Sequence, residues 1–255
     1  MQSVNAEGSA RNTTLNAGAS QTVSGNVDGT QVNGGTQSIY ATGTASNTTL
    51  SNGGQQYLLG AATYTTVNNG SRQQVQAGGI ARNTAVNDDG WQQVLSGGLS
   101  EDAVINRGGL QSVNAEGSAR NTTLSAGASQ TVAGNVDGTQ VNSGTQSIYA
   151  TGTASNTTLS NGGQQYLLGT ATNTTINKDS LQQVQDGGIA RNTTVNDGGW
   201  QQVLSGGSAI DSIVNQGGRL LVDKGGTLAG TTTLYGGAIL SGDVTNHALL
   251  HINTT

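Results

Sequence analysis

Proline, cysteine and phenylalanine are all absent from this 255-residue chain, and charged residues make up only 9% of it. The lack of cysteine excludes disulfide bonds and suits a surface protein that crosses a cell envelope unfolded. The net charge of −5, without a basic stripe, argues against binding to nucleic acid. No apolar run approaches the length of a membrane-spanning helix. With 41 glycines, the composition is far from that of an ordinary globular enzyme.

What the chain does have is repetition at two scales. Residues 2–8 (Gln-Ser-Val-Asn-Ala-Glu-Gly) return at 111–117, a shift of 111 − 2 = 109. Inside this duplication runs a unit of about 19 residues, made of Gln-x-Val, a glycine turn, Ala-x-x-Thr-x-Leu/Val and Asn-x-Gly-Gly. The unit opens at Gln2, Gln21, Gln37, Gln56, Gln73, Gln92, Gln111, Gln130, Gln146, Gln165, Gln182 and Gln201, and then, without the glutamine, at Leu220 and Ile239.

Apolar and polar residues alternate inside each unit, as in Thr13-Thr14-Leu15, and no helical period is present. Gly-Gly and Asn-Gly pairs mark turns between the short strands. The pattern predicts an all-β fold, a parallel β-helix (a single-stranded solenoid) of about thirteen coils of roughly 19 residues. We expect one domain, 1–255, with the tandem duplication 2–110 and 111–219 followed by divergent terminal coils at 220–255. The more apolar sequence after residue 220 is also consistent with the start of a separately folding cap.

The two copies indicate which side chains face inward. Val67 and Ile105 become Ile176 and Val214 in the second copy and stay apolar. The interior of a coil is therefore predicted to hold one Val, one Ala, one Thr or Ser, and one Leu or Val. In the first coil these are Val4, Ala10, Thr13 and Leu15. A buried threonine must bond its hydroxyl, and we expect the backbone or the threonine stacked above it to be the partner.

One column of the repeat is asparagine, at Asn12, Asn47, Asn83, Asn121, Asn156, Asn173 and Asn192. In three successive coils, Asn156, Asn173 and Asn192 should lie one above another. Stacked amides can bond along the solenoid, and they can also bond a second chain. Both interpretations stay open, the purely structural ladder being the simpler.

Other candidates have plainer interpretations. Trp91 and Trp200 are equivalent in the two copies and could stack on sugar rings, although packing on a turn is commoner. Asp88, Asp89 and Asp197 are isolated turn residues rather than a catalytic cluster. His247 and His251 lack an accompanying carboxylate or cysteine, so we predict no metal site. No catalytic residue and no cofactor is predicted.

Exposed hydroxyls recur at or near the glycine turns, with Ser51, Ser96, Ser160 and Ser205 as the leading examples. Regularly spaced serines of this kind could accept an O-linked sugar, and equivalent turns should place the sugars in a row. Ordinary polar turn residues are the simpler interpretation of these serines taken alone.

Two strings carry a family resemblance: residues 78–86 (Gly-Gly-Ile-Ala-Arg-Asn-Thr-Ala-Val) and 90–98 (Gly-Trp-Gln-Gln-Val-Leu-Ser-Gly-Gly). They resemble the passenger repeats of self-associating autotransporter adhesins, the family of AIDA, TibA and antigen forty-three. The resemblance covers essentially the whole chain. It implies a right-handed β-helix, exported through the outer membrane to the bacterial cell surface.

The resemblance also implies activities. These are autoaggregation, biofilm formation and host-cell attachment, so the partners would be another copy of the chain on a neighbouring cell and the host cell surface. A cytoplasmic heptosyltransferase would add O-linked heptose to serine and threonine. Repeat sequence directly follows Met1, without a signal peptide, so we expect the chain to be cut from a longer exported protein.

Two other function classes remain as alternatives. The first is a β-helix enzyme that degrades polysaccharides, and the second is a structural surface fibre such as a phage tail or S-layer. An enzyme needs a charged cleft that occurs once, whereas this chain repeats nearly everything. A trimeric fibre favours coils joined between chains, whereas short turns favour one chain coiling on itself.

Overall fold

The computed structural model of the protein describes residues 1–242 and 246–253, apart from the side chains of 246–249 and 253. These residues form β-strands and turns, and within them no helix is long and apolar enough to cross a membrane. The predicted all-β parallel β-helix, of about 13 coils of ~19 residues, is confirmed. The chain falls into two compact units, Met1–Gln130 and Thr131–Thr255, which we describe one at a time. A single domain over 1–255 stays a prediction.

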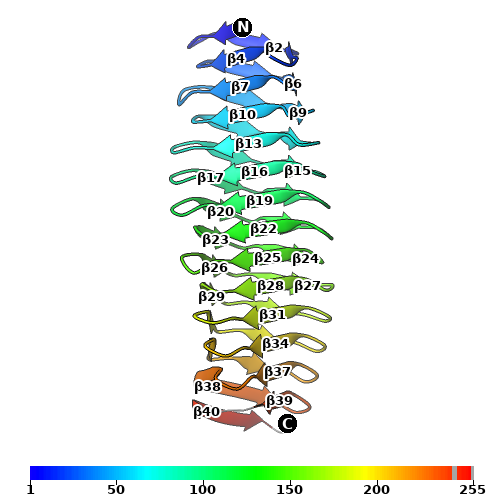
Figure 1. Ribbon diagram of the computed structural model, residues 1–255, viewed down its shortest axis with the longest axis vertical. Helices are drawn as coiled ribbons and strands as arrows, with labels where there is room; N and C mark the ends of the chain where they lie inside the picture. The colour runs from blue at the N-terminus through cyan, green and yellow to red at the C-terminus, as the bar shows by residue number, and fades with distance from the viewer. Residues whose placement is uncertain (243–245, 254–255) are drawn as a thin grey trace. The chain divides into compact units, whose positions relative to one another are not determined.

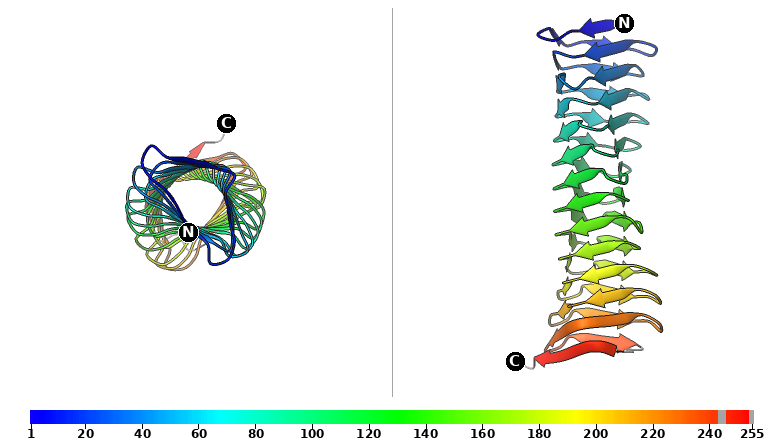
Figure 2. Two further views of the ribbon diagram at one scale, coloured as in Figure 1. Left: turned by 90° about the horizontal axis from the view of Figure 1, so that it is seen from above. Right: turned by 90° about the vertical axis from the view of Figure 1, so that its left-hand side faces the viewer.

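Each coil consists of three short strands. In unit 1, for example, β13 (Arg72–Val75) is the first strand, β14 (Ile80–Arg82) the second and β15 (Ala85–Val86) the third. We call residues 76–79 of this coil the first turn, 83–84 the corner and 87–90 the second turn. The next coil then opens with β16 (Trp91–Val94), parallel to β13 and in register with it. Figure 1 labels β13, β15 and β16, and Figure 2 shows the coils from two further sides.

The strands of unit 1 repeat this order. Its other first strands are β1 (Gln2–Val4), β4 (Ser20–Val23), β7 (Thr36–Ile39), β10 (Gln55–Leu58) and β19 (Leu110–Val113). Its other second strands are β2 (Ser9–Arg11), β5 (Asn26–Asp28), β8 (Thr44–Ser46), β11 (Ala61–Thr63), β17 (Leu99–Glu101) and β20 (Ser118–Arg120). Its other third strands are β3 (Thr14–Leu15), β6 (Gln31–Asn33), β9 (Thr49–Ser51), β12 (Thr66–Val67), β18 (Val104–Ile105) and β21 (Thr123–Leu124).

Unit 2 follows the same order, and β22 (Ser129–Val132) lies at the boundary in the sequence. Its first strands are β25 (Thr145–Ile148), β28 (Gln164–Leu167), β31 (Leu181–Val184), β34 (Trp200–Val203), β37 (Arg219–Val222) and β39 (Ile239–Gly242). Its second strands are β23 (Asn135–Asp137), β26 (Thr153–Ser155), β29 (Thr170–Thr172), β32 (Ile189–Arg191) and β35 (Ser208–Ile210). Its third strands are β24 (Gln140–Asn142), β27 (Thr158–Ser160), β30 (Thr175–Ile176), β33 (Thr194–Val195) and β36 (Ile213–Val214).

The terminal coils depart from the pattern of the other coils. A single long strand, β38 (Thr227–Tyr235), runs through the place of the second strand, the corner and the third strand. Gly230 keeps the positive φ that other coils have at the corner. The last strand, β40 (Asn246–Asn253), pairs along β38 from Leu228 to Tyr235.

The core is made by alternate residues of each strand. In the coil opened by Gln73, the predicted interior residues Val75, Ala81, Thr84 and Val86 are at most 1% exposed. Full burial of one such valine stabilises the fold by roughly 1.5–3 kcal/mol. In the first coil, Val4 and Leu15 are buried, whereas Ala10 and Thr13 are partly exposed because a coil packs on only one side of them.

The predicted interior was incomplete, because the glutamine of Gln-x-Val is also buried. Gln73 is 0% exposed and lies two residues before Val75, on the same face of the strand. Its Nε2 donates to Gln56 Oε1 at 2.8 Å, and its own Oε1 accepts from Gln92 Nε2 at 2.8 Å. The same bond joins every opening glutamine of unit 1 to the next, from Gln2 to Gln130. We call this row the glutamine ladder.

The expected partners of the buried threonine hydroxyls were wrong. Five of these hydroxyls bond the ladder rather than the backbone or one another: Thr48, Thr84, Thr122, Thr157 and Thr193. Five others have no partner among the described residues: Thr30, Thr65, Thr139, Thr174 and Thr232. Thr84 Oγ1 donates to Gln73 Oε1 at 3.2 Å, and Thr193 donates in the same way to Gln182. The reason is the spacing of 84 − 73 = 11 residues, which brings the hydroxyl opposite the amide of its own coil. Where the first turn is only Leu59 and Gly60, the spacing from Gln56 to Thr65 falls to 9, and Thr65 has no partner among the described residues.

Glycine pairs in the turns have two separate roles. Gly78 has φ of 78°, a left-handed conformation that glycine adopts without strain. Gly79 is buried, and a Cβ there would lie 2.1 Å from the carbonyl oxygen of Leu58 in the preceding coil. The close stacking of successive coils therefore requires glycine at the second position of the pair.

Candidate interaction surface

The corner asparagines share one backbone conformation. Each has φ between 52° and 56°, in the left-handed region that asparagine tolerates better than most residues: Asn12, Asn47, Asn83, Asn121, Asn156, Asn173 and Asn192. Tyr64, Asp102 and Asp211 occupy the same corner in other coils, with φ of 55° or 56°. The backbone bend therefore explains why the column recurs, and the side chains are left exposed to solvent.

Hydrogen bonds along this column differ in length. Asn47 Nδ2 donates to Asp28 Oδ1 at 2.7 Å, whereas Asn173 bonds Asn156 at 3.3 Å and Asn192 bonds Asn173 at 3.4 Å. The last two are longer than the usual 2.7–3.2 Å, roughly, for N–H···O bonds. The amides of Asn173 and Asn192 therefore stack without using their full hydrogen-bonding capacity.

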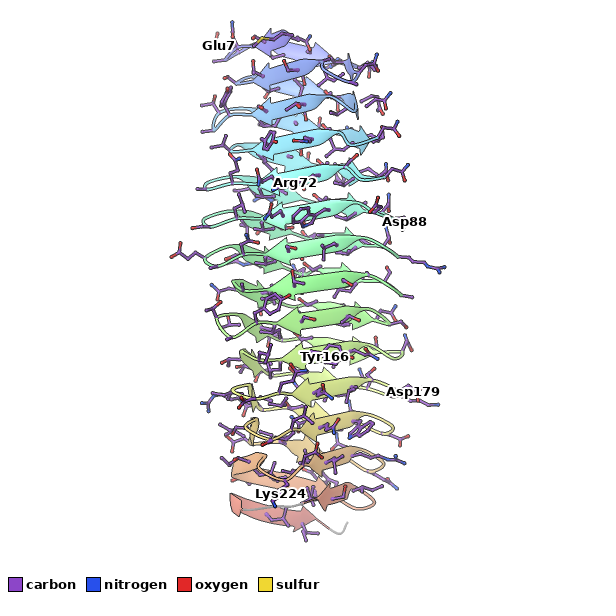
Figure 3. The ribbon with its side chains drawn as sticks, viewed as in Figure 1. Glu7, Arg72, Asp88, Tyr166, Asp179 and Lys224 are labelled. Atoms are coloured by element: carbon purple, nitrogen blue, oxygen red, sulfur yellow. The ribbon has the colours of Figure 1, made fainter. Side chains whose placement is uncertain are left out.

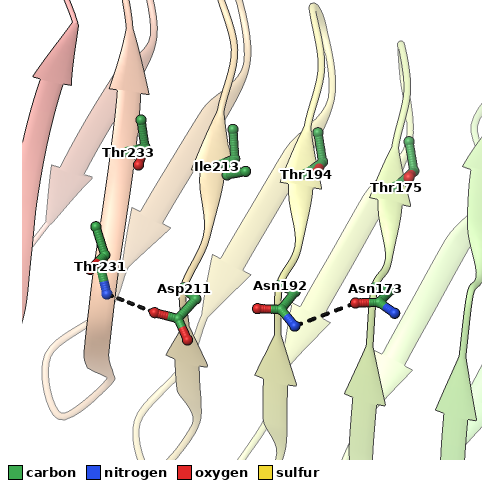
Figure 4. Close-up of a pocket in the computed structure, with 8 residues that line it drawn as sticks. All are labelled: Asn173, Thr175, Asn192, Thr194, Asp211, Ile213, Thr231 and Thr233. Atoms are coloured by element: carbon green, nitrogen blue, oxygen red, sulfur yellow. Dashed lines mark hydrogen bonds between the residues drawn. The ribbon is translucent and has the colours of Figure 1, made fainter.

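These two asparagines line a groove on the outer face of unit 2, with a volume of about 470 Å³. Figure 4 shows its two rows of side chains. The corner row contains Asn173, Asn192, Asp211 and Thr231, and the third-strand row contains Thr175, Thr194, Ile213 and Thr233. At one end of the corner row, Asp211 Oδ1 accepts from the backbone N–H of Thr231 at 2.8 Å. We call this surface the corner groove; it is polar and offers both donors and acceptors.

Charges near the corner occur mainly in unit 1. Hydrogen bonds donated by Asn47 and Ser46 lower the pKa of the Asp28 carboxyl from its ordinary value of 3.8. Arg82 Nε pairs with Glu101 Oε2 at 2.8 Å on adjacent second strands. Both arrangements are solvated, so they contribute little to stability.

The four candidate serines do not form one row, contrary to the expectation. Ser96 and Ser205 lie in first turns and are exposed, whereas Ser51 and Ser160 end the third strands β9 and β27 and are half-buried. First and second turns lie at different edges of a coil, since the whole of the second and third strands separates them. Thr48 and Thr84, expected to face inward, are each 1% exposed.

Ser96 and Ser205 also differ from each other. Ser96 Oγ donates to Glu116 Oε2 at 2.6 Å. The residue equivalent to Glu116 in the second copy is Gly225, so Ser205 has no carboxylate above it, and its hydroxyl is unbonded within the described chain.

Sequence reasoning missed a second asparagine row, at the second turn. Asn87 Nδ2 bonds Asn68 Oδ1 at 2.6 Å, and Asn106 bonds Asn87 at 2.7 Å. In unit 2, Asn196 and Asn215 make the equivalent bonds at 2.8 and 2.7 Å. The signal was present in the repeat unit itself, which ends in Asn-x-Gly-Gly. Because these bonds are short and half-buried, this row is structural.

Catalytic or metal-binding clusters were not expected. Among residues 1–242 and 246–253, no group of three His, Cys, Asp or Glu side chains could hold a metal ion. The side chain of His247, which the sequence pairs with His251, lies outside the described residues.

Comparisons with known proteins agree on one family. The model of a bacterial autotransporter adhesin, described as its probable stalk (AIDA), matches residues 58–109, 147–199 and 186–237. A crystal structure of a TibA55-350 fragment, hyper-glycosylated in a reaction catalysed by TibC, superposes with a TM-score of 0.87 at 36% identity. That match covers 99% of this chain and 94% of the fragment. No curated protein sequence matches the chain.

Proposed function

Because this chain belongs to the stalk family of bacterial autotransporter adhesins, we propose that it acts on the bacterial surface as a self-associating, non-enzymatic adhesin passenger. Its partners are another copy of itself on a neighbouring cell and the host cell surface. Autoaggregation, biofilm formation and host-cell attachment follow from these contacts. The proposal requires export through the outer membrane and no cofactor.

The corner groove supports self-association most directly. Its asparagine amides are exposed and make only long bonds to one another, so each can still donate to and accept from a second chain. Threonines Thr175 and Thr194 add hydroxyls beside them. Many weak polar contacts of this kind along a surface suit a reversible association between cells, since avidity grows with the number of contacts. Asn47, Asn83 and Asn156 would extend the same polar corner in other coils.

The test is the settling of bacteria that display the chain. We expect the double variant Asn173→Gly/Asn192→Gly to slow settling markedly, because it removes two amides from the corner groove. Glycine is the right replacement, since it accepts the left-handed corner without strain. Asn121→Gly, at an equivalent corner outside the groove, is the matched control and should settle normally. Unchanged settling of the double variant, at equal surface display, would refute the role of the groove.

We further propose that the chain accepts O-linked heptose from a cytoplasmic heptosyltransferase. Support comes from the hyper-glycosylated TibA fragment, which shares this fold at 36% identity. The candidate acceptors remain Ser51, Ser96, Ser160 and Ser205, of which Ser96 and Ser205 are the more exposed. Peptide mapping of protein co-expressed with the transferase tests the assignment. Sugar on Thr48 or Thr84 would contradict it, because a pyranose does not fit the close-packed interior.

A further inference from the structure

The two tryptophans lie at equivalent positions in different surroundings. Trp91 opens β16 in unit 1 and Trp200 opens β34 in unit 2, both on the outer face of the first strands. In unit 1, Trp91 pairs with Arg72 in the coil before it and with Leu110 in the coil after it. In unit 2, Leu181 comes before Trp200 and Arg219 after it. Arginine and leucine have therefore exchanged places around the tryptophan.

In unit 1 the arginine covers the ring. The guanidinium carbon of Arg72 lies 4.7 Å from the centre of the Trp91 ring, a cation–π contact. A guanidinium nitrogen also donates to Gln93 Oε1, and Trp91 Nε1 donates to Ser112 Oγ at 3.1 Å. Figure 3 labels Arg72 on the outer face of its strand. One face of Trp91 and its only donor are therefore already occupied.

Each tryptophan borders a groove, of about 440 Å³ at Trp91, but among the described residues only the Trp91 ring is covered by a guanidinium. In unit 2, Leu181 replaces the arginine, and Leu221, which cannot accept a hydrogen bond, replaces Ser112. Trp200 is 39% exposed and borders a groove of about 520 Å³. Asp179 and Asp197 line the groove at the second turns, and Arg219 lines it from the next coil. Its volume is within the range of roughly 300–1,000 Å³ that is typical of small-ligand sites.

We propose that this Trp200 groove binds a neutral pyranose of a polysaccharide, with its ring stacked on the indole. A sugar with equatorial hydroxyls, such as a β-glucosyl unit, presents axial C–H groups to the electron-rich face of the ring. The carboxylates of Asp179 and Asp197 accept from its hydroxyls, while Arg219 and the indole N–H donate to its oxygens. With two carboxylates and one guanidinium at the rim, the site disfavours acidic sugars.

This site is separate from the proposed surface of self-association. The corner groove is built from corners and third strands, whereas the Trp200 groove is built from first strands and second turns. Its sugar is a bound ligand, not a covalent modification. Sugar binding by purified, soluble protein is therefore measured independently of aggregation and of heptose transfer.

The duplication supplies matched controls for a binding experiment. The chain has only two tryptophans, so in a Trp91→Phe background the tryptophan fluorescence, excited at a wavelength that the six tyrosines do not absorb, reports Trp200 alone. Titration with cellotriose should give a saturable change, and trigalacturonic acid should bind more weakly. Leu181→Arg, which copies the unit 1 arrangement, should weaken cellotriose binding roughly tenfold while keeping the tryptophan. In the wild-type background, followed by calorimetry, Trp200→Ala should lose binding and Trp91→Ala should keep it.

Opposite results would overturn the inference. These are no saturable response to millimolar cellotriose, tighter binding of trigalacturonic acid, or an unchanged affinity in Leu181→Arg. Equal losses in Trp91→Ala and Trp200→Ala would also contradict it. If circular dichroism shows that Trp200→Ala is unfolded, Leu181→Arg decides the question, because it replaces a side chain on the outer face and leaves the core unchanged.

Discussion

The side-chain Nε2 of Gln92 lies 2.8 Å from Oε1 of Gln73 in the preceding coil, and both side chains are fully buried. Gln92 Oε1 in turn accepts from Gln111 at 2.7 Å and from Ser100 at 3.0 Å. These amides thus recover inside the protein the hydrogen bonds that they lose to water. The register is fixed by the valine of the same strand, since a shift of one residue would turn Val75 outward and place Gln74 and Gln76 inside.

Interrupting the ladder should therefore destabilise the protein. We expect Gln92→Leu to cost about 1–3 kcal/mol, because it removes one of the two acceptors of the buried Gln111 amide and the acceptor of the Ser100 hydroxyl. Gln92→Glu should cost more, since it buries a charge. Gln93→Leu, one residue along and on the outer face, should have a small effect because its partners can bond water. Denaturant unfolding measures the differences, and equal midpoints for Gln92→Leu and Gln93→Leu would contradict the role of the ladder.

A charge on the inner face should be far more damaging than one on the outer face. Val75 is 0% exposed, whereas Gln74 is partly exposed on the other side of the same strand. Val75→Asp should lower the free energy of unfolding by more than about 3 kcal/mol, and Gln74→Asp by less than about 1 kcal/mol. Thermal unfolding followed by circular dichroism compares the two variants. Similar melting temperatures would disprove this register.

The carboxyl of Asp28 should titrate below its ordinary pKa of 3.8, because Asn47 and Ser46 donate hydrogen bonds to the charged form. Its pKa is depressed in the folded state, so its contribution to stability is present above pH 3.8 and is lost as the pH falls through the folded-state pKa. Carbon-13 NMR of the carboxyl measures the value. Asn47→Gly, which keeps the left-handed corner, should raise this pKa; an unchanged pKa would exclude Asn47 as the main cause.

Ser205 should accept sugar more readily than Ser96. The Ser96 hydroxyl is bonded to the Glu116 carboxylate, whereas the equivalent neighbour of Ser205 is Gly225. Glu116→Gly should therefore raise the occupancy of Ser96 towards that of Ser205 in peptide mapping of co-expressed protein. Higher occupancy of Ser96 in the unaltered chain would show that the carboxylate does not protect it.

The fold could be predicted from the sequence because the same alternation of inward and outward residues recurs in every repeat. Val67 and Ile105 stay apolar in the second copy, and both are fully buried. Gln73 was missed because the predicted interior of a coil contained only apolar residues and one Thr or Ser, although the spacing of two from Val75 places Gln73 on the same face. Burial of a side-chain amide costs little free energy only when the neighbouring coil supplies its hydrogen-bond partner. That partner lies 16 to 19 residues away in the sequence, as in Gln21–Gln37 and Gln73–Gln92.

The candidate surface was predictable only in part. The asparagine column could be identified from the sequence, but the bond lengths that separate Asn173 from Asn47 depend on which side chain lies in the neighbouring coil. The different surroundings of Trp91 and Trp200 follow from the exchange of Arg72 for Leu181. Register alone shows that exchange, whereas the stacking of Arg72 on the ring depends on side-chain conformations that no repeat pattern specifies.

The glutamine ladder also has a direction. In unit 1 every amide donates towards the N-terminal side, so the side-chain dipoles are parallel and reinforce one another. A half-formed stack thus presents vacant acceptor oxygens to the next segment of chain, which brings the matching N–H. In unit 2, Leu220 succeeds Gln201, whose oxygen accepts from Ser212 of its own coil at 3.0 Å. The row of glutamines therefore ends at Gln201 without an unpaired acceptor oxygen.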